Sequence, residues 1–107
     1  MIVKGVEFHD LPLTGIDFAF GRNEIILSFE KYDENSKLYT PLKAYFNQVM
    51  KIVVDQIEID DLHHAEIASM ELDESKETKS AKIIMLMGWS KPPATLTFEY
   101  ASVNYSW

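Results

Sequence analysis

The fold of this chain is decided by a stretch whose pattern recurs in the second half. It reads Phe8-His9-Asp10-Leu11-Pro12-Leu13-Thr14-Gly15-Ile16-Asp17-Phe18, and 54 residues later Leu62-His63-His64-Ala65-Glu66-Ile67-Ala68-Ser69-Met70-Glu71-Leu72. Two more apolar blocks recur: 25–29 aligns with 83–87 at an offset of 58, and 42–49 aligns with 96–103 at an offset of 54. Such changes of offset are typical of loops that differ in length between retained strands. The sequence therefore predicts an internal repeat, with units at residues 1–54 and 55–107.

Alternating apolar residues predict strands through most of both units. In the first unit the expected strands cover residues 2–6, 13–20, 24–30 and 42–46, with a polar loop at 31–40. In the second unit they cover 66–73, 81–87, 94–100 and 103–107, with loops at 74–79 and 88–93. The stretch 48–59 also allows a helical spacing, but its β-branched residues favour a strand.

A lone four-stranded unit of about 50 residues would leave one face of its sheet exposed to water. The two units are therefore expected to bury those faces against each other. This predicts an all-β, single-domain fold of about eight strands, built from two similar four-stranded units. Both a sandwich and a closed barrel satisfy the requirement.

The composition limits the classes of protein to which the chain can belong. It has 107 residues and no cysteine, which excludes disulfides and thiolate chemistry. No apolar run approaches the roughly 18 residues of a membrane helix, and no signal-peptide pattern is seen. We therefore expect a cytoplasmic, bacterial type of protein, without a cofactor.

The net charge of −7 is unevenly distributed. Residues 1–54 hold six Lys/Arg and seven Asp/Glu, whereas residues 55–107 hold four Lys and ten Asp/Glu. Nine of those ten acids lie between Asp55 and Glu77. Such a field repels nucleic acid and anionic membranes, and it attracts a basic partner. The simpler alternative is a solvated face that keeps a small protein soluble.

Histidines and carboxylates occur together at the repeated position. They are His9, Asp10, His63 and His64, with Asp60, Asp61 and Glu66 close in the sequence. Divalent metals take such ligands, but three or four must converge, and no spacing here guarantees that. A histidine before a strand more often bonds to a turn. Acid–base catalysis is chemically reasonable, but no nucleophile or phosphate-binding motif accompanies it. Neither a metal site nor an enzyme is predicted.

Large apolar residues are concentrated near the end of the chain: Met85, Met87, Trp89, Tyr100, Tyr105 and Trp107. The strand at 83–87 is apolar on both faces, so it is either central and buried or turned toward a partner. The aromatic residues could anchor an interface or simply fill a small core. An unpaired edge strand in this region would favour a homodimer.

The repeated stretches also resemble a known type of motif. Phe8-His9-Asp10 and Leu62-His63-His64-Ala65-Glu66-Ile67 are similar to the His-Asp-Ala-Glu-Ile type of motif of small bacterial β-proteins, over about eleven residues in each half. Some of these proteins are immunity proteins of polymorphic toxin systems. In this chain Leu11-Pro12 follows His9-Asp10, and His64 is an extra residue. The resemblance implies a cytoplasmic protein that binds and neutralises another protein, and it supplies no catalytic residues.

These observations favour a non-enzymatic protein-binding module that occludes a basic partner. Carboxylates would speed encounter with the partner, and a buried anchor would slow its release. The expected partner-binding residues are Asp60, Asp61, Glu66, Asp73, Glu74, Glu77 and Trp89. Two alternatives stay open: a barrel that binds a small molecule or metal, and a homo-oligomer built through the last strand. Neither nucleic acid nor a membrane is an expected partner.

Overall fold

The computed structural model describes residues 2–3, 5–56, 66–88 and 91–107, and shows an all-β fold. Its strands are β1 (Ile2–Val3), β2 (Val6–Glu7), β3 (Leu13–Ala19), β4 (Glu24–Asp33), β5 (Leu38–Asn47), β6 (Met50–Asp55), β7 (Glu66–Asp73), β8 (Lys79–Leu86), β9 (Ala94–Tyr100) and β10 (Ser102–Ser106). A short 3₁₀ turn, Phe20–Arg22, connects β3 to β4.

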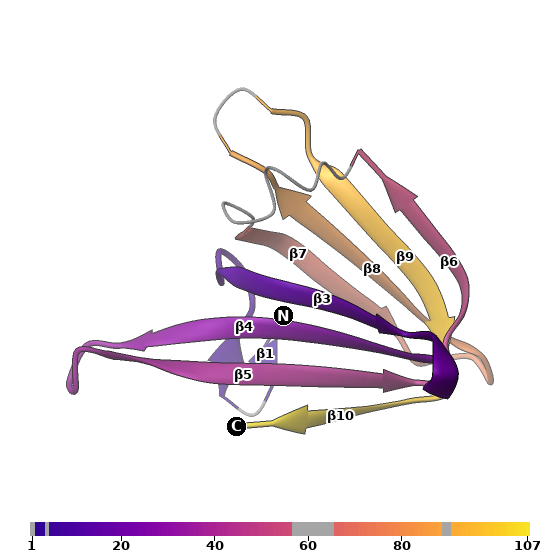
Figure 1. The fold of residues 1–107 in the computed structure, drawn as a ribbon, viewed down its shortest axis with the longest axis horizontal. Coiled ribbons are helices and arrows are strands. Elements are labelled where there is room, and N and C mark those ends of the chain that lie inside the picture. Colours follow the sequence, from indigo (N-terminus) through magenta and orange to yellow (C-terminus); the bar gives the residue numbers. More distant parts are fainter. Residues whose placement is uncertain (1, 4, 57–65, 89–90) are drawn as a thin grey trace.

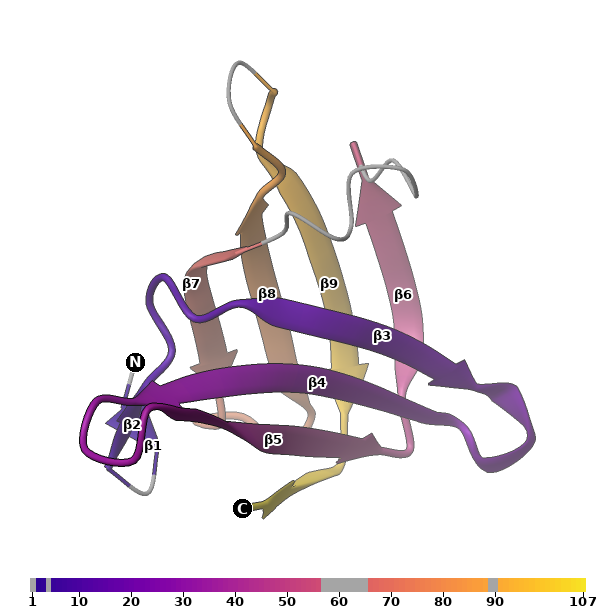
Figure 2. The same cartoon turned by 60° about the vertical axis from the view of Figure 1, so that its left-hand side comes forward.

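The strands form two four-stranded antiparallel sheets and one small hairpin of β1 and β2. Sheet I has the order β10-β5-β4-β3, and sheet II has the order β6-β9-β8-β7. The two sheets lie face to face, and their strands cross at a wide angle (Figures 1 and 2). Each sheet keeps two edge strands among the described residues, so of the two predicted architectures this is the sandwich and not the closed barrel.

The two halves of the chain exchange their fourth strands. Strands β3, β4 and β5 come from the first half, but β10, from the end of the chain, completes their sheet. Conversely, β6 leaves the first half and pairs with β9 in sheet II. Each sheet therefore takes three consecutive strands from one half and one strand from the other. The sequence repeat did not predict this exchange.

The two crossings between the sheets are bonded to each other. The chain leaves sheet I after Asn47 and leaves sheet II at Ala101, whose N–H donates to the Asn47 carbonyl over 3.0 Å. The Asn47 side-chain amide also donates to the Ser102 hydroxyl over 3.3 Å. Gln48, which follows Asn47, has a φ of 54°, the left-handed conformation that such a corner uses. The exchange is thus held at one point where both segments turn.

The ladders show where the two halves are equivalent. A bulge interrupts the β3–β4 register between Leu13 and Gly15. A second bulge interrupts the β7–β8 register between Ile67 and Ser69, at positions 54 residues later in the chain. In the β4–β5 ladder Phe29 lies opposite Leu42, and in the β8–β9 ladder Ile83 lies opposite Leu96. The structural offset between β4 and β8 there is therefore 54, not the 58 of the sequence alignment. Because the difference is even, the inward face of the strand is unchanged.

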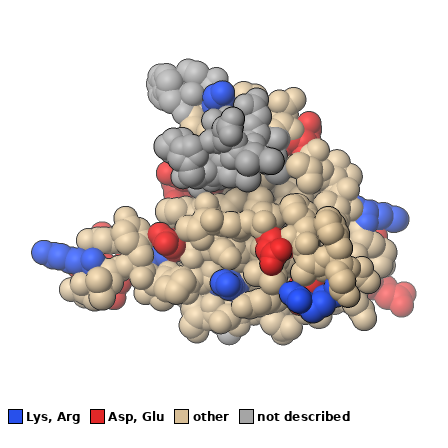
Figure 3. Space-filling model, in the orientation of Figure 1, with Lys and Arg blue, Asp and Glu red and all other residues tan. Residues whose placement is uncertain are grey.

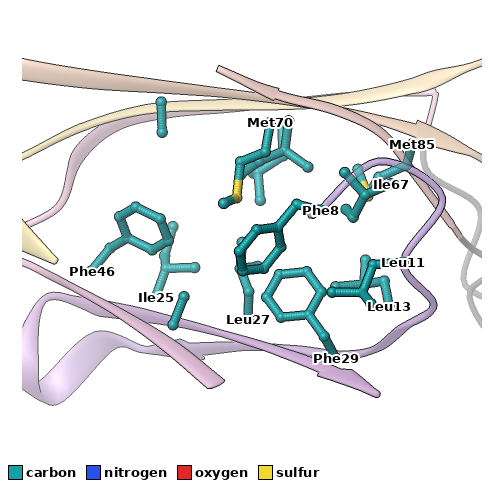
Figure 4. Close-up of a cluster of buried hydrophobic side chains, with 14 of the residues drawn as sticks. Phe8, Leu11, Leu13, Ile25, Leu27, Phe29, Phe46, Ile67, Met70 and Met85 are labelled. Atoms are coloured by element: carbon teal, nitrogen blue, oxygen red, sulfur yellow. The ribbon is translucent and has the colours of Figure 1, made fainter. Parts of the chain in front are cut away.

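The core lies between the sheets and is apolar. Its largest fully buried side chains come from both sheets and from the segment before β3 (Figure 4); they include Phe8, Phe29, Phe46, Ile67, Ile83, Met85 and Tyr100. The Phe46 ring of sheet I lies 4.9 Å from the ring of Phe98 and 5.0 Å from that of Tyr100, both in sheet II. Edge-to-face contacts of this kind join the two layers.

Two predicted segments were wrong. Residues 31–40, expected as a loop, extend β4 to Asp33 and begin β5 at Leu38, so only 34–37 form the turn. The extension is favoured by a cross-strand pair, Tyr32 opposite Tyr39. The single strand expected at 2–6 is instead the β1–β2 hairpin, with Gly5 at a φ of 80° between the strands.

The strand exchange makes a prediction about half-length fragments. A fragment of residues 1–56 retains β6 but lacks its partner β9, and its β5 lacks β10. We expect no cooperative thermal transition from this fragment as a monomer, because both sheet edges and the inner face are exposed. Circular dichroism melting, with sedimentation to fix the association state, tests this. A monomeric fragment that melts cooperatively would contradict the interdependence of the two halves.

Candidate functional site

The structure does not gather the predicted partner-binding residues into one surface. Asp60, Asp61 and Trp89 lie outside the described residues. Of the others, Glu66 begins β7, while Asp73 ends it and Glu74 and Glu77 follow in the β7–β8 turn. All four are exposed. At about 3.3 Å per residue, the two ends of β7 are about 23 Å apart. Only Asp73, Glu74 and Glu77 share one place, the β7–β8 turn.

Asp73 has a structural role in that turn. Its Oδ1 accepts hydrogen bonds from the Ser75 hydroxyl over 2.6 Å and from the Ser75 N–H over 3.0 Å. These bonds, the hydroxyl first, hold the pKa of the Asp73 carboxyl below its usual value. A carboxylate that closes its own turn in this way is the usual reason for an aspartate at the start of a loop.

Glu74 is held by a core residue. The Tyr100 side chain is 1% exposed, and its hydroxyl donates to Glu74 Oε1 over 3.0 Å. Burial raises the pKa of the Tyr100 hydroxyl, and the nearby Glu74 carboxylate raises it further. The same two causes raise the pKa of Tyr105. Two of the three acids in this turn therefore stabilise the fold, whatever else they bind.

The outer face of sheet II carries charges of both signs. The described residues of its strands and turns (50–56, 66–88 and 91–100) hold seven Asp/Glu and five Lys. Lys51 Nζ lies 3.5 Å from Glu99 Oε1, and Lys82 faces Glu71 across the β7–β8 ladder. On the side of the molecule that Figure 3 shows, which is also the side seen in Figure 1, blue and red side chains are interspersed as well. The described part of sheet II is thus not a single-sign acidic surface. Two of the predicted partner-binding acids, Asp60 and Asp61, fall in 57–65, outside the described residues.

The first half of the histidine cluster lies at the surface. His9 Nδ1 is 3.1 Å from Asp10 Oδ2, and both side chains are 62% exposed. The His9 N–H donates to Glu7 Oε1 over 3.0 Å, and the Asp10 N–H donates to the Ile67 carbonyl over 2.6 Å. The described residues contain no group of three metal-ligating side chains. His63 and His64 lie outside the described residues.

Most of the large apolar residues near the end of the chain fill the core. Met85, Met87 and Tyr100 are buried, and Tyr105 is half-buried. The Trp107 ring is 6.0 Å from that of Phe8 and 5.1 Å from that of Tyr105. In β8 the outward Leu86 is 43% exposed, so this central strand has an open outer face.

The sequence analysis missed an exposed aromatic arm. The arm, residues 31–40, is the part of the β4–β5 hairpin that extends beyond sheet II (Figure 1), and all of its residues are exposed. Tyr32, Leu38 and Tyr39 are 46%, 66% and 60% exposed, and the two tyrosine rings meet edge to face at 5.1 Å. The arm could have been recognised in the sequence from Tyr32 and Tyr39, which are placed symmetrically about a short polar turn.

The tip of the arm is ordered by its own hydrogen bonds. Asp33 Oδ1 accepts from the Asn35 N–H over 2.9 Å, and the Lys37 N–H donates to the Asp33 carbonyl over 2.7 Å. The Asn35 N–H and then the Ser36 hydroxyl lower the pKa of the Asp33 carboxyl. Lys37 takes the left-handed conformation, with a φ of 57°. Beneath the arm is an open groove of about 470 Å³ that includes Val6, Leu42 and Trp107.

Comparison with protein-family models, with curated proteins and with solved structures found no match to this chain. The resemblance to immunity proteins therefore stays a prediction. Among the described residues, no helix is long and apolar enough to cross a membrane.

The Tyr100–Glu74 bond makes a prediction about pH. We expect Tyr100→Phe to lower the free energy of unfolding by about 1 kcal/mol at pH 7, the typical worth of one hydrogen bond. Because the pKa of Tyr100 is raised in the folded state, its stabilising effect is present below the unfolded value of about 10 and is lost as pH rises above it. The variant should therefore lose less stability than the wild type between pH 9 and about 11.

Urea unfolding followed at a series of pH values measures this difference. Tyr39→Phe is the matched control, since its ring is exposed on the arm. Equal pH dependence of wild type and Tyr100→Phe would contradict the assigned role of the hydroxyl.

Proposed function

We propose that this chain is a protein-binding domain whose principal anchor is the arm. The observation that carries the proposal is the exposure of Tyr32, Leu38 and Tyr39 on a hairpin that extends beyond the core. Tyrosine is enriched among the residues that dominate the energy of protein interfaces, because it buries a large ring and keeps a polar group at its tip. An arm of this kind fits into a cleft of a partner.

The order of the arm supports the proposal. The Tyr32–Tyr39 ring contact and the bonds around Asp33 hold the arm in one conformation before any partner arrives. A binding element that is already ordered loses less conformational entropy on association than a flexible loop does. The exposed side chains are therefore presented at low cost.

We propose further that the partner is a basic protein, met in the cytoplasm and neutralised by occlusion. The net charge of −7 supports this, since it raises the encounter rate with a positively charged protein. The arm itself is balanced, with Lys31 and Lys37 against Asp33 and Glu34. In this proposal charge distributed over the molecule attracts the partner, and the aromatic arm holds it. An immunity role would be one case of such binding.

The arm is tested by the double variant Tyr32→Ser, Tyr39→Ser. Partner proteins would be captured by the wild type from a bacterial lysate, identified, purified and measured again as binary complexes. We expect the double variant to bind at least about tenfold more weakly, mainly through faster dissociation, with an unchanged melting temperature. Phe20→Ser, at a ring 78% exposed on the β3–β4 turn, is the control and should bind normally. Unchanged dissociation of the double variant would refute the arm as anchor.

The charge contribution is tested separately by Glu66→Lys with Glu77→Lys. These acids are exposed, and neither takes part in the turn bonds made by Asp73 and Glu74. We expect association with the purified partner to slow several-fold at low salt, with little change in dissociation. The difference should diminish as salt is added, because exposed charges are screened. An association rate equal to that of the wild type at low salt would argue against a basic partner.

A further inference from the structure

Strand β6 presents apolar residues that the fold does not require. It is an edge of sheet II, and all six of its residues are exposed. Met50, Ile52, Val53 and Val54 are 50%, 39%, 57% and 49% exposed. An edge strand leaves one row of backbone N–H and C=O groups available for pairing with another chain. In Figures 1 and 2 no other described strand lies along the outer side of β6.

The equivalent edge strand of sheet I shows that an exchanged fourth strand need not expose apolar side chains. Strand β10 is also an edge and also the exchanged fourth strand of its sheet. It turns Val103 and Tyr105 inward and exposes Ser102, Asn104 and Ser106. The same structural position is thus polar in one sheet and largely apolar in the other. The exposed Ile52-Val53-Val54 run of β6 therefore calls for a covering partner.

The two faces of β6 are set by its ladder to β9. Val53 and Asp55 lie opposite Thr97 and Thr95, which alternate with buried Leu96 and Phe98, so they are on the outer face. Lys51 joins them there, because its Nζ contacts Glu99 on the same face. A bulge after Met50 gives Lys51 a φ of 54° and shortens the regular part of the strand. Lys51, Val53 and Asp55 therefore form one outward row, and Ile52 and Val54 face the other way.

We infer that β6 pairs with β6 of a second copy of this chain, antiparallel and centred on Val53. In this register Lys51 of each copy faces Asp55 of the other, Ile52 faces Val54, and Val53 faces itself. Two opposite-charge pairs and three apolar pairs form without any like charges in opposition. Centring the pair on Ile52 or Val54 would place Lys51 or Asp55 opposite Val53, so the centre at Val53 alone matches charge with charge. The two copies of sheet II then form one continuous sheet of eight strands.

This inference does not depend on the proposed function. It uses the free edge of sheet II, whereas the arm belongs to sheet I, so a dimer could present two arms. Pairing uses the β6 edge of each copy, so this edge joins two copies and no more. The irregularity between Met50 and Val53 also keeps the paired segment short. A two-fold axis at Val53 uses the only free edge of sheet II among the described residues that carries this apolar run, and the contact closes on itself.

Cysteine cross-linking tests the register directly, because the chain has no cysteine of its own. Residues that face themselves across an antiparallel pair have Cα atoms about 4.5–5.5 Å apart, within the range that a disulfide spans. We expect Val53→Cys to form a covalent dimer rapidly under mild oxidation. Asn104→Cys, at an exposed site on the polar edge β10, is the matched control and should stay monomeric. Equal cross-linking of the two variants would overturn the inference.

A charge-swap series tests the same register without covalent bonds. Lys51→Asp alone and Asp55→Lys alone each place like charges in opposition twice, and should weaken the dimer about tenfold in analytical ultracentrifugation. The double variant restores opposite charges and should recover the dimer, although the Lys51–Glu99 contact stays lost. Melting curves confirm that each variant folds. A wild-type chain that stays monomeric at about 1 mM, or a double variant no tighter than the singles, would overturn the inference.

Discussion

The rest of the structure depends on the burial of two apolar sheet faces against each other by a chain that crosses between them twice. Each sheet has one inward face, and the Phe46, Phe98 and Tyr100 rings meet where those faces touch. Because β6 and β10 each belong to the sheet of the other half, neither layer can form without the other. The Asn47–Ala101 hydrogen bond fixes both crossings at one corner. A domain of this size buries little apolar surface, so the loss of such contacts is not compensated elsewhere in the core.

The exposed apolar side chains of the molecule lie where the contact between the two sheet faces ends. In the β4–β5 hairpin the last buried residues are Phe29 and Leu42. Every residue of the arm beyond them is exposed, and Tyr32 and Tyr39 pack on each other. At the opposite side, β6 lies at the margin of sheet II, where even Val54, opposite buried Leu96, is 49% exposed. The arm and the β6 edge thus both lie where the contact between the two sheets ends, and both expose apolar side chains.

The sequence predicted the all-β class, a strand in the stretch 48–59 and most other strand positions, because period-two alternation reports directly on burial. In that stretch the structure has β6 at Met50–Asp55, and 57–59 lie outside the described residues. It did not predict the strand exchange, since an internal repeat is the same whether β6 folds back on β5 or crosses to β9. The polar run 33–37 concealed the arm, because turn residues outweighed the flanking tyrosines. Charge counting grouped Glu66 with Asp73, although β7 holds them at opposite ends. It also could not show that Asp73 and Glu74 bond within their own turn and core.

The exchange of strands also affects how the protein is made. On the ribosome, β3, β4 and β5 emerge early, but the fourth strand of their sheet, β10, is the stretch Ser102–Ser106. Until that stretch is synthesised, the nascent chain carries an incomplete sheet whose apolar face is exposed, and such chains are prone to aggregation. Completion of sheet I consequently waits until β10 has emerged, and the long-range pairing that it requires is slow. A chaperone that shields nascent strands would benefit this chain more than one whose halves fold as they appear.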